Sequence, residues 1–188
     1  MEGQPMMTEI RISGYGGQGV IRCGYIIGKA ASLFDNKYAT MTQSFGPEAR
    51  GSACSSQVLV SEDKILYPYV TTPDILVAMS QEAYTKFLPN LDESGILIID
   101  DDLVTPQEAK GNIKTYAIPS TRFAEDMGAK ILANIVMLGF FTAVTGLVSP
   151  EAVKKAVSTS VPERLKDLNL KAFEKGYQFG QEIKEASK

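Results

Sequence analysis

The chain has 188 residues, with 19 basic and 22 acidic side chains, so its formal net charge is −3 and it lacks the basic excess of a nucleic-acid-binding protein. It contains no histidine, which removes the commonest general base and the usual ligand of most zinc sites. Its two cysteines, Cys23 and Cys54, are too few to ligate an iron–sulfur cluster by themselves. The composition therefore predicts no catalytic and no metal-ligating residues in this chain.

The length fits a single domain that spans residues 1–188. Residues 1–7 are expected to be disordered, and they lack the basic, apolar and cleavage regions of a signal peptide. The widely spaced cysteines form no disulfide framework. We therefore expect a cytoplasmic protein.

A glycine-rich turn is the most informative local feature. The alternating run Glu9–Ser13 predicts a strand, Gly14, Gly16 and Gly19 predict a tight turn, and a helix should begin near Gly17. Such a turn brings bare backbone N–H groups to the positive end of a helix, where a phosphate or carboxylate can bind. The same spacing also serves close packing of a strand against a helix, so both interpretations stay open.

The remaining elements alternate between strands and helices. Helices are expected at Val20–Phe34 and Gln81–Leu88, after Ser149-Pro150, and from Pro162 to about Lys184; strands are expected at Tyr38–Thr42, Ala53–Val60, Ile65–Tyr67, Asp74–Met79, Ile96–Ile99 and Lys114–Ile118. The polar turn Ser61–Lys64 predicts a hairpin between two of these strands. The expected fold is a doubly wound, mostly parallel α/β sheet (Rossmann-like) with an inserted β-hairpin and a helical C-terminal part.

The segment Ile131–Val148 contains no charged residue and approaches the length of a membrane span. It includes Asn134 and Gly139 and stops at Ser149-Pro150, so burial inside the protein or against another subunit is the preferred interpretation. We expect no membrane association.

Three consecutive aspartates, Asp100–Asp102, follow an apolar strand. They could ligate a metal ion, but adjacent side chains on a strand point in different directions. A solvated strand end or a helix cap is the alternative, and it is the one we favour.

The glycine spacing could also indicate a dinucleotide site. That interpretation needs an acidic residue at the end of the second strand to hold the ribose, but this strand ends in Thr42-Gln43-Ser44. No Gly-Lys-Ser/Thr follows the turn, so it is not a Walker loop either. A free-standing nucleotide-binding Rossmann protein remains the alternative interpretation.

Taken in order, several motifs of the chain strongly resemble the gamma subunit of 2-oxoacid:ferredoxin oxidoreductases, most closely the 2-oxoglutarate type. The motifs are Gly14-Tyr-Gly-Gly-Gln-Gly-Val20, Thr42-Gln-Ser-Phe-Gly-Pro-Glu-Ala-Arg-Gly51, Val58-Leu-Val-Ser61 with Tyr67-Pro68, Pro73-Asp-Ile-Leu-Val77 with Gln81-Glu-Ala-Tyr84, Asn134-Ile-Val-Met-Leu-Gly139 and Thr145-Gly-Leu-Val148. They extend over roughly residues 8–160.

This resemblance implies a subunit of an enzyme that decarboxylates a 2-oxoacid on thiamine diphosphate, passes electrons through iron–sulfur clusters to ferredoxin and transfers the acyl group to coenzyme A. Alpha and beta subunits would hold the thiamine, and a delta subunit would supply clusters. The isolated chain would bind no cofactor and would be inactive, with a homodimer as a possible state. The cofactor-binding residues that we predict on this basis, for coenzyme A or a partner carboxylate, are Gly14, Gly16, Gly17, Gln18, Gly19, Glu48 and Arg50.

Overall fold

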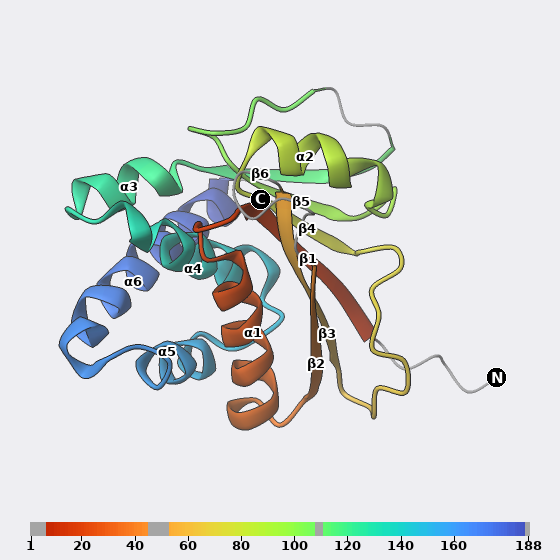
Figure 1. The fold of residues 1–188 in the computed structure, drawn as a ribbon, viewed down its shortest axis with the longest axis horizontal. Helices are drawn as coiled ribbons and strands as arrows, with labels where there is room; N and C mark the ends of the chain where they lie inside the picture. The colour runs from red at the N-terminus through yellow and green to blue at the C-terminus, as the bar shows by residue number, and fades with distance from the viewer. Residues whose placement is uncertain (1–6, 45–52, 108–110, 187–188) are drawn as a thin grey trace.

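The computed structural model describes residues 7–44, 53–107 and 111–186. Within these residues a six-stranded sheet has the order β2-β3-β1-β4-β5-β6 (Figure 1). The strands are β1 (Met7–Tyr15), β2 (Tyr38–Ser44), β3 (Ala53–Ser61), β4 (Ile75–Ala78), β5 (Ile96–Asp100) and β6 (Lys114–Ile118). The helices are α1 (Val20–Phe34), α2 (Gln81–Phe87), α3 (Ser120–Asp126), α4 (Ala133–Thr145), α5 (Pro150–Ser158) and α6 (Glu163–Ala186).

Five strands run in one direction and β3 runs against them. The pairs β1–β4, β4–β5 and β5–β6 are parallel, whereas β3 is antiparallel to both β1 and β2. The predicted doubly wound, mostly parallel α/β sheet is therefore confirmed, with β3 as its one antiparallel strand. Met7, which we expected in a disordered segment, is the first residue of β1.

The predicted hairpin between Ala53–Val60 and Ile65–Tyr67 is wrong. The antiparallel hairpin is formed by β2 and β3 instead, and residues 65–67 form no strand. The physical reason lies in β3, whose last residue, Ser61, already pairs with Met7 on one side and Tyr38 on the other. No free edge of β3 is left for a further strand.

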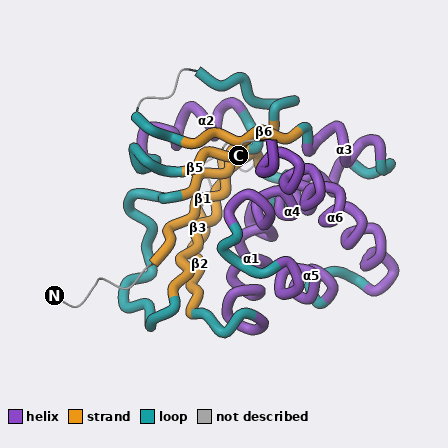
Figure 2. Tube along the Cα trace, turned by 180° about the vertical axis from the view of Figure 1, so that it is seen from behind, coloured by secondary structure: helices purple, strands orange, loops and turns teal. Residues whose placement is uncertain are grey.

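Helices cover the two faces of the sheet unequally. Ile75 and Val77 of β4 face the larger core with α1, α4, α5 and α6, whereas Leu76 and Ala78 face a smaller core with Tyr84 of α2. Figures 1 and 2 show α2 on one side of the sheet and the helical C-terminal part with α1 on the other. Alternate residues of this short apolar strand are thus buried on opposite faces, as a doubly wound sheet requires.

The apolar segment Ile131–Val148 contains α4, and burial within this chain accounts for its composition. Twelve of the residues of α4 are buried, most of them in the larger core. The helix crosses α6 at close range. A Cβ atom at Gly139 would collide with the carbonyl oxygen of Phe173, and a Cβ atom at Gly176 would collide with the carbonyl oxygen of Val136. Among the described residues, no helix is both long and apolar enough to cross a bilayer.

Cys23 lies inside the larger core, where its thiol donates a hydrogen bond to the carbonyl oxygen of Asn134 at 3.2 Å. Burial raises the pKa of the Cys23 thiol to about 12, against a small opposing effect of Arg22. The fold thus favours the neutral thiol. This contribution to stability is present below the unfolded pKa of about 9 and is lost as the pH rises toward the folded pKa.

We therefore expect the stability difference between the wild type and Cys23→Ala to shrink by about 2 kcal/mol between about pH 8 and about pH 10.5. Urea unfolding at both pH values measures this difference. Ile27→Val, which removes buried volume but no titrating group, should differ from the wild type by a constant amount. A constant difference for Cys23→Ala as well would contradict the prediction.

Candidate functional site

The glycine turn is held in shape by the side chain of Gln18. Its Oε1 accepts a hydrogen bond from the backbone N–H of Tyr15 at 2.6 Å, and its Nε2 donates to the carbonyl oxygen of Met79 at 2.7 Å. The backbone N–H of Gln18 also donates to the carbonyl oxygen of Tyr15 at 3.1 Å. Gln18 therefore ties the end of β1 to the end of β4, and both ends of its amide are occupied by the protein.

Different physical constraints apply to the four glycines of the turn, Gly14, Gly16, Gly17 and Gly19. Gly17 and Gly19 have φ values of 98° and 78°, which strongly favour glycine, and α1 begins only after them, at Val20 rather than near Gly17 as expected. A Cβ atom at Gly14 would collide with Gln18. At Gly16 neither reason applies, because its φ is not positive and a Cβ atom would meet no described atom within 4 Å.

A cavity of about 690 Å³ lies beside this turn. It is bordered by Gly16 and Gly17, by Arg22 and Tyr25 of α1, and by Ile131 and Asn134, among others. We call it the glycine-turn cavity. Its wall is mainly apolar, and its polar side chains include Arg22, Gln43 and Asn134, a composition typical of small-molecule sites.

The structure thus brings three of the predicted residues, Gly16, Gly17 and Gly19, to one cavity. Arg22 and Asn134 were not predicted as site residues. Arg22 lies in the first turn of α1, directly after the glycines. Asn134 donates from Nδ2 to the carbonyl oxygen of Gly19 at 3.4 Å, although 115 residues separate the two.

Glu48 and Arg50 lie outside the described residues. The strand ends on either side of them can be placed, however, because Tyr15 pairs with Ala53, and Ser44 pairs with Ser55. The ends of β1 and β2 and the start of β3 therefore share one edge of the sheet.

Two of the three aspartates, Asp100 and Asp102, cap the first turn of α3 from the end of β5. Asp100 is fully buried, and its Oδ2 accepts hydrogen bonds from Ser120 Oγ at 2.6 Å, Thr121 Oγ1 at 2.7 Å and Thr121 N at 3.0 Å. Asp102 accepts from the backbone N–H of Arg122 at 3.0 Å and also pairs with its guanidinium. Partial burial and the neighbouring Asp102 raise the pKa of Asp101, while Arg122 lowers it. This arrangement supports the helix-cap interpretation over a metal site.

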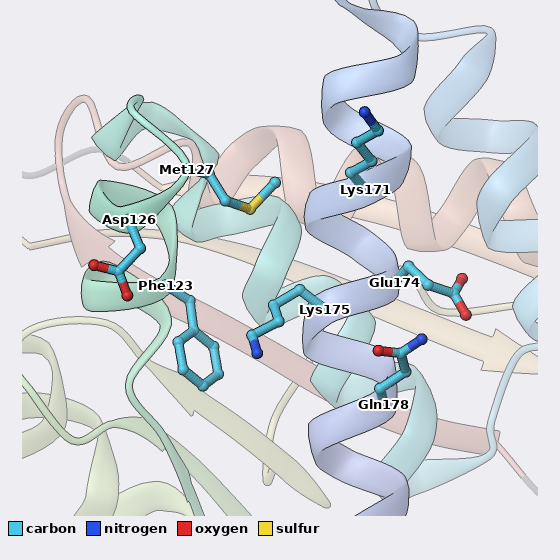
Figure 3. Close-up of a pocket in the computed structure, with 7 residues that line it drawn as sticks. All are labelled: Phe123, Asp126, Met127, Lys171, Glu174, Lys175 and Gln178. Carbon is cyan, nitrogen blue, oxygen red and sulfur yellow. The ribbon is translucent and has the colours of Figure 1, made fainter.

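A second hollow, of about 470 Å³, lies between α3 and α6 (Figure 3). Phe123 and Met127 form its apolar part, and Lys175 lies over the Phe123 ring with its Nζ 4.6 Å from the ring centre. Glu174 is paired with Lys154 at 2.9 Å. Two of its charged side chains, Lys175 and Glu174, are thus already engaged within the protein, and we assign this hollow no ligand.

The chain is similar to known proteins in both sequence and fold. Residues 9–179 match the family described as pyruvate ferredoxin/flavodoxin oxidoreductase. The chain is 48% identical, over 180 residues, to 2-oxoglutarate synthase subunit KorC of Methanocaldococcus jannaschii, covering 95% of this chain and 96% of that protein.

Two solved structures share the fold. The keto/oxoacid ferredoxin oxidoreductase gamma subunit of Geobacter sulfurreducens is 45% identical with a TM-score of 0.82, over 92% of this chain and 98% of that one. The 2-oxoglutarate:ferredoxin oxidoreductase of Magnetococcus marinus, with 2-oxoglutarate, coenzyme A and succinyl-CoA bound, is 24% identical with a TM-score of 0.86. That match covers 95% of this chain and 31% of the Magnetococcus chain.

The match to the family extends over most of the chain, and the sequence identity to gamma-type subunits is high over nearly their whole length. The chain belongs to the pyruvate ferredoxin/flavodoxin oxidoreductase family, as a gamma subunit of a 2-oxoacid:ferredoxin oxidoreductase most similar to the 2-oxoglutarate type.

Proposed function

We propose that this chain supplies part of the coenzyme A site of a thiamine-diphosphate-dependent enzyme complex that acts on 2-oxoglutarate. The complex would release CO₂, form the acyl-CoA product and reduce ferredoxin. Alpha and beta subunits would hold the thiamine, and a delta subunit would carry iron–sulfur clusters. The gamma chain would bind and orient coenzyme A in the cytoplasm without being catalytic by itself.

The observation that carries this proposal is the open space at Gly16. Packing explains Gly14 and Gly19, and backbone conformation explains Gly17 and Gly19. Gly16 alone is left without either reason, and it faces the glycine-turn cavity. A missing side chain at such a position lets a ligand approach the backbone closely.

The electrostatics of the cavity suit the phosphates of coenzyme A. The N-terminal end of α1, a helix of 15 residues with no acidic residue in its first turn, lies at the cavity. Free N–H groups and the partial positive charge of this end favour an anion. Arg22 adds a full positive charge and forms no ion pair with any residue that the structure describes.

The apolar wall suits the pantetheine arm. Ile21, Tyr25 and Ile131 can cover its methylene groups, while the amides of Gln43 and Asn134 can pair with its amide groups. Coenzyme A would accept the acyl group when bound. The chain's own thiols are poor competing acceptors, because burial raises the pKa of both Cys23 and Cys54 and so disfavours the nucleophilic thiolate.

The purified complex tests this proposal. Arg22→Ala and Arg50→Ala should each raise the KM for coenzyme A by about 5- to 150-fold, because loss of a charge-assisted hydrogen bond costs about 1–3 kcal/mol. The KM for 2-oxoglutarate should not change. The gamma chain alone should show no turnover with 2-oxoglutarate, coenzyme A and an electron acceptor.

Arg164→Ala serves as the matched control, because Arg164 is an exposed arginine of α6 that does not border the cavity. An unchanged KM for coenzyme A in both test variants, with normal assembly of the complex, would contradict the proposed site. Turnover by the isolated chain would contradict its non-catalytic role.

A further inference from the structure

Arg11 of β1 is a buried cation that has no anion among the residues that the structure describes. Its neighbours on the strand, Ile10 and Ile12, face the larger core, so the side chain of Arg11 points to the opposite face of the sheet. There its guanidinium lies over the Phe87 ring of α2, 4.8 Å from the ring centre. The residue is only 9% exposed, yet it forms no ion pair within the described part of the chain.

The charge of Arg11 is also poorly compensated by hydrogen bonds. Its Nε is the one buried side-chain nitrogen or oxygen of the described residues that has no hydrogen-bond partner. The terminal nitrogens of the guanidinium form no hydrogen bond with these residues either, but they are not buried, so this end of the side chain reaches the surface. Burial lowers the pKa of Arg11, against a smaller opposing effect of Glu9. A buried charge of this kind is normally paired, because taking it out of water without a partner is costly.

A second cation lies next to the same ring. The Nζ of Lys86 is 5.3 Å from the centre of the Phe87 ring, and Lys86 forms no ion pair with a described residue. Arg11 and Lys86 thus make this part of the surface positively charged. It lies at the border of the smaller core, which includes residues of β4, β5 and β6 but none of β2 or β3.

Two exposed tyrosines lie on the loop that is anchored beside Arg11. Tyr67 and Tyr69 are 59% and 55% exposed, and their rings meet edge to face with centroids 5.3 Å apart. Two residues further on, the backbone N–H groups of residues 71 and 72 donate to the carboxylate of Glu9, at 2.7 Å and 3.0 Å. Glu9 is two residues from Arg11, so both side chains lie on the same face of the sheet. We call Arg11, Lys86, Tyr67 and Tyr69 the Arg11 surface.

We propose that the Arg11 surface docks another subunit of the enzyme, and that an aspartate or glutamate of that subunit pairs with the guanidinium of Arg11. A carboxylate can bind the terminal nitrogens, and because the guanidinium charge is delocalised, it compensates the whole group. Tyrosine and arginine are the side chains that, with tryptophan, most often dominate the energetics of protein interfaces. The surface therefore fits an acidic side chain that is surrounded by apolar groups.

The position of Arg11 favours a carboxylate carried by a protein over a small anion. Arg11 borders neither the glycine-turn cavity nor the hollow between α3 and α6. A small anion at an open surface would be held by few groups, whereas the contacts of a whole interface hold the side chain of a docked subunit in place. The proposal is independent of the coenzyme A site, because the glycine-turn cavity lies beside α1, on the other face of the sheet.

Arg11→Met tests the proposal through two measurements. In the isolated chain it removes an unpaired buried charge, so the midpoint of urea unfolding should not fall. In the purified complex it leaves the partner's carboxylate unpaired, so the gamma subunit should dissociate at least tenfold more readily in a dilution series followed by sedimentation velocity. Lys86→Glu should also weaken assembly, because it places a negative charge near that carboxylate. Arg164→Met and Lys171→Glu, at exposed positions of α6, are the matched controls and should not weaken it.

Cross-linking of the complex identifies the occupant of the surface. A carbodiimide joins an amine to a carboxylate in direct contact, so the Arg11→Lys complex should form an amide between position 11 and an aspartate or glutamate of another subunit, detected by mass spectrometry. The wild-type complex is the control, since arginine does not react. A link only to Glu9 of the same chain, a link to a second gamma chain, or no link would overturn the proposal. Unchanged assembly of both the Arg11→Met and the Lys86→Glu complexes would overturn it as well.

Discussion

Gly176→Ala should lower the free energy of unfolding by about 2–3 kcal/mol, although alanine is the better helix former. A Cβ atom at this position would collide with the carbonyl oxygen of Val136 in α4, and it would also lie 3.1 Å from the backbone nitrogen of Phe140. Because these atoms belong to the backbone of a buried helix, they cannot rotate away as the end of a flexible side chain could. The two helices would have to separate. Urea unfolding followed by circular dichroism measures the loss.

Gly28→Ala provides the matched control. Gly28 is also inside a helix, but a Cβ atom there would lie 4.0 Å from its nearest neighbours, Ala39 and Val58, at ordinary contact distance. This variant should therefore gain about 0.5–1 kcal/mol from helix propensity alone. Equal gains at both positions would show that the α4–α6 contact is looser than the structure indicates.

The contact at Gly176 is also an example of a feature that could not be predicted from the sequence. The absence of charge in Ile131–Val148 predicted a buried helix, and α4 is one. Whether it would be buried in this chain or against another subunit stayed open, because nothing in the sequence places Gly176 beside Val136. That contact joins residues 40 positions apart, and it depends on how α6 crosses α4.

The sheet illustrates the same division between local and distant information. The segment Asp74–Met79 was identified as a strand because burial on both faces leaves a continuous apolar sequence, and β4 occupies Ile75–Ala78 of it. Ile65–Tyr67 has a similar composition, yet it forms no strand, since β1 and β2 already occupy both sides of β3. Composition predicts that a segment can pair, but competition among distant segments decides which of them does.

At the candidate site, the sequence identified the turn but not its surroundings. Glycine spacing predicted the backbone conformation, which depends on the residues Gly14–Gly19 themselves. Ile131 and Asn134 border the same cavity only because α4 begins beside the first turn of α1. Such neighbours follow from helix packing, which no spacing within the turn can predict.

Asp100→Ala should destabilise the protein by about 3 kcal/mol, because it would leave buried donors without an acceptor. The carboxylate is fully buried, and its Oδ2 accepts from both hydroxyl groups of Ser120 and Thr121 and from the backbone N–H of Thr121. Its Oδ1 accepts from the backbone N–H of Asp102 at 3.1 Å. These bonds join the end of β5 to the start of α3. Thermal and urea unfolding measure the effect.

Asp101→Ala is the matched control from the next position. The Asp101 side chain is 43% exposed, and its closest ion-pair distance to Arg122 is 4.0 Å, so its removal should change stability by less than about 0.5 kcal/mol. The pair of variants also separates the two interpretations of the aspartates. If Asp100–Asp102 bound a metal ion, Mg²⁺ or Ca²⁺ would stabilise the wild type and both substitutions would abolish that gain. If they cap α3, neither ion should raise the unfolding temperature, because donors of the protein already occupy both oxygens of Asp100.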